Sequence, residues 1–142
     1  MTSRKGSAGS RFVKYWLPVL LYTCLIFSLS SIPGGLAGPW IPHIDKLEHL
    51  LEYGLYGLLL GRAFRFTVGG PRGFLWAVGS VLVGAAIGAA DELYQAHVPR
   101  RNSDVYDWAT DLTAVLLAVL YTQWVHVRPL AKRAAPREER AE

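Results

Sequence analysis

Apolar residues gather in four long stretches of the chain, at about residues 12–31, 44–64, 74–95 and 105–127. Each stretch approaches the roughly 20 residues that a helix needs to cross the hydrocarbon of a membrane. Prolines and glycines, which favour irregular loops, separate the first two stretches at 33–42 and the next two at 69–71. The pattern therefore predicts an all-α fold, an integral membrane bundle of four transmembrane helices.

Composition agrees with this prediction. The chain has 142 residues, enough for one ordinary domain, and 51% of them are hydrophobic. Only 18% are charged, against about 25% in typical soluble proteins, which excludes disorder and disfavours a soluble enzyme. We expect a basic segment over 1–11, a membrane domain over 12–127 and a charged tail over 128–142. The single cysteine, Cys24, excludes an intrachain disulfide and a cysteine-cluster metal site.

The basic residues predict the orientation in the membrane. Most of the 15 Lys and Arg flank the same side of the four stretches. They are Arg4, Lys5, Arg11, Lys14, Arg62, Arg65, Arg72, Arg128, Lys132, Arg133, Arg137 and Arg140. Because cytoplasmic segments carry the excess of basic residues, both termini should be cytoplasmic in a multi-pass protein of the cell membrane. A cleaved signal peptide is the competing interpretation of the first stretch, and the dispersed basic residues argue against a nucleic-acid partner.

Acidic residues collect at the opposite, outer ends of the last three stretches. Outside the tail they are Asp45, Glu48, Glu52, Asp91, Glu92, Asp104, Asp107 and Asp111. An ionisable group inside a spanning helix costs at least about 2–3 kcal/mol, so such a concentration favours a shared polar site. Helical spacing places Asp45, His49 and Glu52 along one face, and Asp104, Asp107 and Asp111 along another.

Two segments of this acidic region resemble the signature of VanZ-like membrane proteins. They are DKLEHLLEYGLYG at 45–57 and DELYQAHVPRRNSDVYDWATD at 91–111. The matching positions are Asp45, Lys46, His49, Tyr53, Asp91, Glu92, Gln95, Arg101, Asp104 and Asp107. The family usually has Asn where this chain has Asp111, which adds one acid to the candidate site. The resemblance covers about residues 12–127.

The resemblance implies a role at the cell envelope rather than a defined reaction. The name-giving member is associated with reduced susceptibility to teicoplanin-type glycopeptides. We therefore expect cell-envelope homeostasis or glycopeptide tolerance, by binding or moving an envelope component. The expected partners are the lipid bilayer and an envelope lipid or a glycopeptide-related ligand.

The residues themselves leave a structural and a binding interpretation open. In the first, Lys46 and Arg101 form ion pairs with Asp45 and Asp107 that fix the register of the helices, while Asp104 caps the fourth helix. In the second, an outward-facing acidic pocket holds a cationic group, a divalent cation or a lipid-linked intermediate. Carboxylates suit Mg²⁺, Ca²⁺ or Mn²⁺, whereas zinc would normally take more than one imidazole. His97 could cooperate with His49, but His43 and His97 fit equally well as loop residues.

A third interpretation is a membrane-embedded enzyme acting on a lipid-linked or phosphate-bearing substrate. His49 or Glu92 could then act as a base, and Arg101 with Lys46 could hold a phosphate or carboxylate. The sequence has no signature of a serine or cysteine nucleophile and no glycine-rich phosphate loop.

Overall fold

Four helices make up the part of the chain that the computed structural model describes, which is residues 8–35, 44–68 and 74–134. They are α1 (Ala8–Ser30), α2 (Ile44–Val68), α3 (Leu75–Gln95) and α4 (Val105–Ala134). These residues contain no strand, so the predicted all-α class with four helices is confirmed. Most of the predicted basic segment and charged tail, at 1–7 and 135–142, lies outside the described residues.

The helices extend further than the apolar stretches that predicted them. Helix α2 continues to Val68 and α4 to Ala134, past the expected ends at 64 and 127. An apolar pattern marks where contact with an apolar environment stops, whereas a helix ends where its backbone hydrogen bonds end. Arg65 in the last turn of α2 also favours continuation, because a cation there interacts well with the helix dipole.

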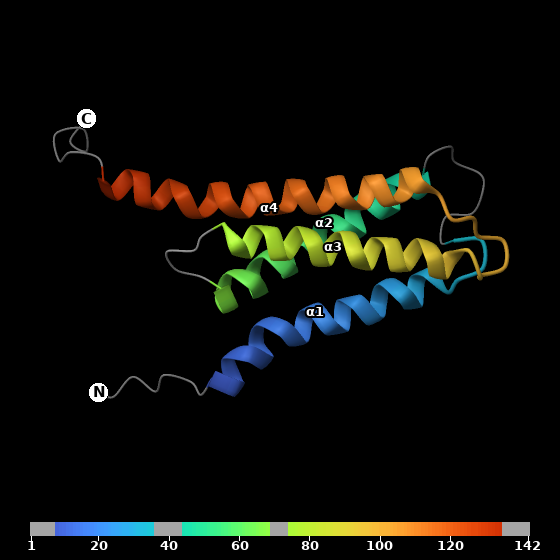
Figure 1. Ribbon diagram of the computed structural model, residues 1–142, viewed down its shortest axis with the longest axis horizontal. Helices are drawn as coiled ribbons and strands as arrows, with labels where there is room; N and C mark the ends of the chain where they lie inside the picture. The colour runs from blue at the N-terminus through green and yellow to red at the C-terminus, as the bar shows by residue number, and fades with distance from the viewer. Residues whose placement is uncertain (1–7, 36–43, 69–73, 135–142) are drawn as a thin grey trace.

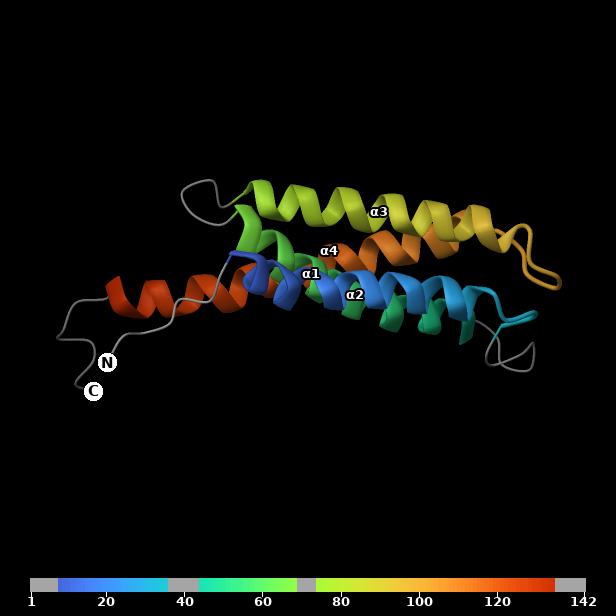
Figure 2. The ribbon, with the colours of Figure 1, turned by 90° about the horizontal axis from the view of Figure 1, so that it is seen from below.

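The helices form an elongated antiparallel bundle, with α2 in contact with each of the other three (Figure 1). Both perpendicular views place the start of α1, the end of α2, the start of α3 and the end of α4 at the same end of the bundle (Figure 2). The opposite end carries the turn at 31–35 and the connection at 96–104. We call this opposite end the polar end, because it contains the predicted acidic residues.

Close approach of α2 to α4 depends on glycine. A Cβ added to Gly57 would lie 2.9 Å from the Cα of Val115 and 2.8 Å from the Cβ of Ala118. Gly84 of α3 lies on another side of the same valine, where an added Cβ would be 2.8 Å from its methyl groups. Small residues thus let three helices meet around the fully buried Val115.

Gly57→Ala should therefore destabilise the bundle by about 1–3 kcal/mol, since the new methyl group meets backbone that cannot move aside. The measurement is the free energy of unfolding in detergent micelles. Gly54→Ala is the matched control on the same helix, because nothing lies within 4 Å of its added Cβ. Alanine is the better helix former, so the control should be unchanged or slightly more stable. Equal stability of the two variants would refute the close approach.

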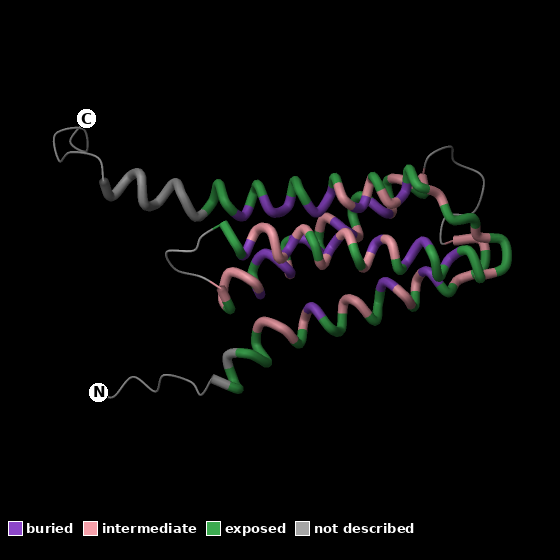
Figure 3. Tube along the Cα trace, viewed as in Figure 1, coloured by how far each residue is buried: buried purple, intermediate pink, exposed green. Residues whose placement is uncertain are grey.

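Two of the helices, over Phe12–Ser30 and Leu75–Gln95, are long and apolar enough to cross a membrane. Only 11% of the first window and 33% of the second are buried inside the bundle, unlike the core helix of a soluble protein. Large apolar side chains are exposed on all four helices, among them Leu20, Leu51, Leu82 and Leu120. Along α4 as far as Val125, one side is buried and the other is exposed (Figure 3).

Candidate functional site

All eleven predicted site residues lie toward the polar end, where they form three groups joined by hydrogen bonds and ion pairs. The first group is centred on Lys46, the second on His49 and the third on Asp91 and Arg101. The amino-terminal turns of α2 and α4, the last turns of α3 and the connection at 96–104 supply them. Their role in binding a ligand stays a prediction.

Lys46 is surrounded by carboxylates. Its Nζ lies 2.7 Å from Asp107 Oδ1, 3.3 Å from Asp104 Oδ2 and 3.6 Å from Asp45 Oδ2. The pairing with Asp107 is the closest and the most protected, because the aspartate side chain is only 9% exposed. With three acids already around it, Lys46 is poorly placed to hold a phosphate together with Arg101.

Asp104 caps α4 and connects it to α3. Its Oδ1 accepts a hydrogen bond of 2.8 Å from the backbone N–H of Tyr106, which satisfies a free donor at the helix start. Its own backbone N–H donates to Glu92 Oε2 at 2.8 Å. The bond from Tyr106, assisted by Lys46, lowers the pKa of the Asp104 carboxyl below its ordinary 3.8. The stabilisation by this carboxylate is therefore present at neutral pH and lost as the pH falls through the lowered pKa.

His49 lies between two acidic side chains from the other helices. Its Nδ1 is 2.8 Å from Asp111 Oδ1, and its Nε2 is 3.9 Å from Glu92 Oε1. All three residues are buried, with exposed fractions of 5% for His49, 5% for Glu92 and none for Asp111. When Asp111 is ionised its carboxylate only accepts hydrogen bonds, so His49 then donates from Nδ1 to Asp111 and directs Nε2 toward Glu92.

Asp91 is held by neighbours on two helices. The hydroxyl of Tyr53 donates to its Oδ2 at 3.4 Å, and Gln95 Nε2 donates to the same oxygen at 3.1 Å. Gln95 Nε2 also donates to Ser30 Oγ at 3.3 Å, which ties this group to the end of α1.

Arg101 fastens the connection at 96–104 to α1. Its guanidinium donates to the carbonyl oxygens of Leu29 at 3.1 Å and Ile32 at 3.3 Å, and to Gln95 Oε1 at 3.4 Å. The ion pair with an aspartate that the structural interpretation expected is not found for Arg101 among the described residues. Two of its three partners are backbone carbonyls, which carry no recognisable sequence signal.

Negative charge exceeds positive charge in the interior of the site. Within the described residues, four buried carboxylate oxygens have no hydrogen-bond partner. They are Glu52 Oε1, Asp91 Oδ1, Glu92 Oε1 and Asp111 Oδ2. A buried polar atom without a partner costs about 1–3 kcal/mol, and more when it is charged. These oxygens therefore indicate either protonated acids or a missing cationic partner.

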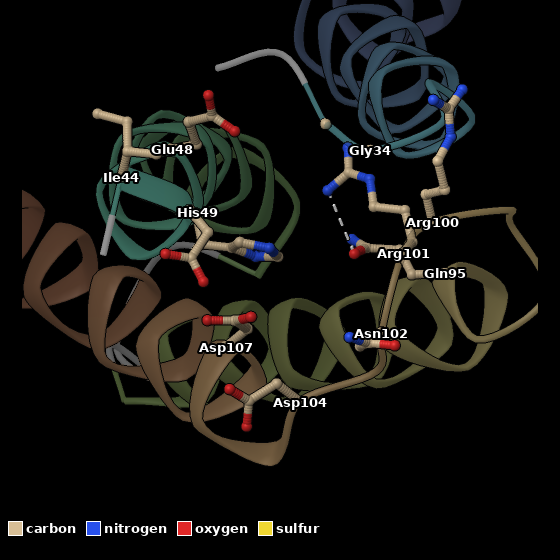
Figure 4. A pocket seen from close by; sticks show the side chains of 12 residues that line it. Gly34, Ile44, Glu48, His49, Gln95, Arg100, Arg101, Asn102, Asp104 and Asp107 are labelled. Atoms are coloured by element: carbon tan, nitrogen blue, oxygen red, sulfur yellow. Dashed lines mark hydrogen bonds between the residues drawn. The ribbon is translucent and has the colours of Figure 1, made fainter. Parts of the chain in front are cut away.

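A pocket of about 260 Å³ lies at the polar end, beside these groups. Its lining consists of Gly34, Gly35, Ile44, Asp45, Glu48, His49, Gln95, Arg100, Arg101, Asn102, Asp104 and Asp107. Arg100 and Arg101 lie on one side, whereas carboxylates from α2 and from the start of α4 lie across from them (Figure 4). The pocket thus has a cationic wall and an anionic wall.

Several lining residues were not among the predicted site residues. Gly34 and Gly35 have φ values of 81° and 79°, and Arg100 has a φ of 61°, so tight left-handed turns shape this part of the pocket. The breaker-rich sequence after residue 32 indicated a loop there but not its contact with the site. His97 is exposed, with Nδ1 2.8 Å from Leu93 O, and does not line the pocket, while His43 lies outside the described residues.

No known protein family, curated protein or solved structure matches this chain. The resemblance to VanZ-like proteins therefore rests on the two motif segments alone.

Proposed function

We propose that the chain is a four-span protein of the cell membrane with both termini cytoplasmic, and that its outward-facing polar pocket binds an envelope component. The observation that carries this proposal is the pocket with two oppositely charged walls. A head group with an anionic phosphate or carboxylate beside a cationic amine would complement it, since each charge would face an opposite one. Membrane lipids and lipid-linked wall precursors include such groups.

The apolar surface supports placement in the membrane. Soluble monomers rarely expose large contiguous apolar patches, yet leucines are exposed on every helix of this bundle. The acidic residues of α2 and α4 lie near the polar end, most of their basic residues lie toward the opposite end, and large apolar side chains such as Leu55, Leu58, Leu117 and Leu120 are exposed between them. Fusions of a reporter that is active only in the cytoplasm test the orientation: activity at Arg101 would contradict it.

The first helix contributes to the site, which supports its retention as a transmembrane helix rather than its removal as a signal peptide. Ile26 is fully buried against the other helices, and Thr23 Oγ1 lies 2.9 Å from the hydroxyl of Tyr56 in α2. The contacts of Gln95 and Arg101 with the end of α1 would be lost on cleavage.

Pocket binding is tested with variants that line the pocket without holding the bundle together. Arg100 and Asn102 are both exposed lining residues, so Arg100→Glu and Asn102→Ala should leave the fold intact. We expect wild-type protein purified in mild detergent to retain a phosphate-bearing lipid detectable by native mass spectrometry. Arg100→Glu should lose most of it, because the cationic wall is reversed.

His97→Ala is the matched control, since His97 is exposed near the polar end but does not line the pocket. It should keep both the bound lipid and any glycopeptide tolerance that the wild type confers on a bacterial host. Wild-type lipid retention and tolerance in Arg100→Glu at normal membrane abundance would contradict the binding proposal and favour the purely structural network.

A second candidate is an enzyme acting on the same class of lipid. The observation that favours it is His49, which lines the pocket and is oriented by Asp111 from behind, as in a general base. Incubation of the purified protein with phosphate-bearing lipids distinguishes the two functions. A covalently altered lipid would establish the enzyme, whereas an unaltered bound lipid favours binding or transport.

A further inference from the structure

We infer that Lys14 of α1 and Arg62 of α2 bind the phosphate of an anionic phospholipid at the end of the bundle opposite to the polar end. Both views place the start of α1 and the end of α2 together at this end (Figure 1, Figure 2). The side chains of Lys14 and Arg62 are both exposed there. The inference rests on the proposed placement in a membrane, but it does not depend on ligand binding in the polar pocket.

One aromatic ring brings the two cations together. Lys14 Nζ lies 5.8 Å and Arg62 Cζ lies 4.9 Å from the centroid of the Tyr15 ring. At such distances the electron-rich face of an aromatic ring attracts a cation. The ring is itself held in place, because it stacks on Phe66 of α2 with the two centroids 4.2 Å apart. The two charges thus come from different helices, and a head group beside this ring would meet both of them.

The next residue of α1 fastens the two helices at the same level. Trp16 Nε1 donates a hydrogen bond of 2.9 Å to Thr67 Oγ1, and the Trp16 ring meets Phe64 edge-on with the centroids 5.1 Å apart. These contacts fix the separation of α1 and α2, so the two cations are positioned before any ligand binds. Tyr and Trp are also the residues that gather at the level of the lipid head groups.

No carboxylate neutralises these two cations among the described residues. Every ion pair in that part of the chain involves Lys46 or His49, at the polar end. Glu52, the last acid of α2, lies about 15 Å before Arg62 along the helix axis. Lys14 and Arg62 are therefore available to an external anion. The cytoplasmic leaflet of a cell membrane supplies anionic lipids, and the proposed orientation directs this end of the bundle toward it.

Exposed leucines favour a phospholipid over a free phosphate ion. Leu17 follows Lys14 by about one turn and is 45% exposed, and Leu58 precedes Arg62 by about one turn and is 37% exposed. Because α1 and α2 are antiparallel, each leucine lies nearer the middle of the bundle than its cation. A phosphate held by the cations would therefore place its acyl chains beside the leucines. Arginine suits the phosphate, since its planar fork can donate two hydrogen bonds to it.

The test is titration of delipidated protein in detergent with phosphatidylglycerol and with phosphatidylcholine of the same acyl chains, followed by native mass spectrometry. Phosphatidylglycerol carries the phosphate but no cationic group, unlike the head group proposed for the polar pocket. All titrations use the Arg100→Glu chain, so that a lipid in the polar pocket does not contribute. We expect phosphatidylglycerol to bind at least about fivefold more tightly than phosphatidylcholine. Equal affinity for the two lipids, or displacement of phosphatidylglycerol by millimolar inorganic phosphate, would overturn the inference.

Substitutions in this background locate the lipid. Lys14→Gln and Arg62→Gln each remove one charge from an exposed side chain, and each should weaken the binding of phosphatidylglycerol by about fivefold. Arg65→Gln is the matched control, because it removes the same charge from the same end of α2. Arg65 lies over Trp76 instead of Tyr15, with its Cζ 5.6 Å from the ring centroid, so this change should weaken binding less than about twofold.

Two outcomes of this comparison would overturn the site. An equal loss in Arg65→Gln and Arg62→Gln would show that the lipid responds only to the general positive charge of this end. Unchanged affinity in both Lys14→Gln and Arg62→Gln would show that it binds elsewhere. Arg62→Gln in the chain that keeps Arg100 should retain the lipid of the polar pocket, so the failure of one proposal is distinguishable from the failure of the other.

Discussion

Replacing His49 by alanine is expected to lower the free energy of unfolding by about 3–5 kcal/mol. The substitution removes the ring that approaches both Asp111 and Glu92, and these carboxylates are buried on different helices. They would then face each other without the imidazole between them. Removing one partner of a buried charged pair costs more than the pair itself contributes, because the remaining charge is left uncompensated.

The measurement is denaturant unfolding in detergent micelles, followed by circular dichroism. His97→Ala is the control, since this histidine is exposed in the turn after α3 and its ring hydrogen-bonds the carbonyl of Leu93, and its effect should stay within about 0.5 kcal/mol. The double variant His49→Ala/Asp111→Asn should recover part of the loss, with a coupling of about 0.5–3 kcal/mol. Additive effects, or a loss below about 1 kcal/mol for His49→Ala, would contradict the buried pair.

The acids of the site differ in how far they are exposed to solvent. Asp45 has the same chemistry as Asp111 and lies on the same predicted stripe as His49, but its side chain is 54% exposed. Its pairing with Lys46 at 3.6 Å is therefore screened by solvent and contributes little. A shared helical face in the sequence does not by itself give a shared environment.

The position of the acids at the ends of the apolar stretches predicted which residues gather at one end, and helical spacing predicted which of them share a face. The i, i+4 relation of Asp91 and Gln95, for example, appears as a hydrogen bond of 3.1 Å. The partners between helices could not be predicted in this way. They depend on how each helix is rotated about its axis, which is set by close approaches such as that of Gly57 to Val115.

Contacts of side chains with the backbone could not be predicted from the sequence either. The motif segments included Arg101, and its charge indicated a phosphate or carboxylate partner. Its observed partners include the carbonyl oxygens of Leu29 and Ile32, which every residue type possesses. No pattern of side chains could have indicated them.

Arg101→Met is expected to cost about 2–3 kcal/mol, because a hydrogen bond from a charged group contributes roughly 1.5–3 kcal/mol and these three bonds are long and partly exposed. The loss of stability should be confined to the end of α1 and the turn that follows it. Backbone amides at residues 26–35 should exchange hydrogen for deuterium faster than in the wild type, since the guanidinium joins this end of α1 to the connection at 96–104.

Arg100→Met is the adjacent control, because Arg100 has the same charge, lies in the same connection and is exposed. It should change neither the stability nor the exchange of α1. Arg101→Lys should resemble Arg101→Met, since a lysine keeps the charge but lacks the planar fork that reaches two carbonyls and an amide oxygen at once. Full stability in Arg101→Lys would show that charge alone is required and would favour an acidic partner over the carbonyls of α1. Faster exchange over the whole chain, instead of at 26–35, would show that Arg101 stabilises the bundle generally and does not specifically hold the first helix to the polar end.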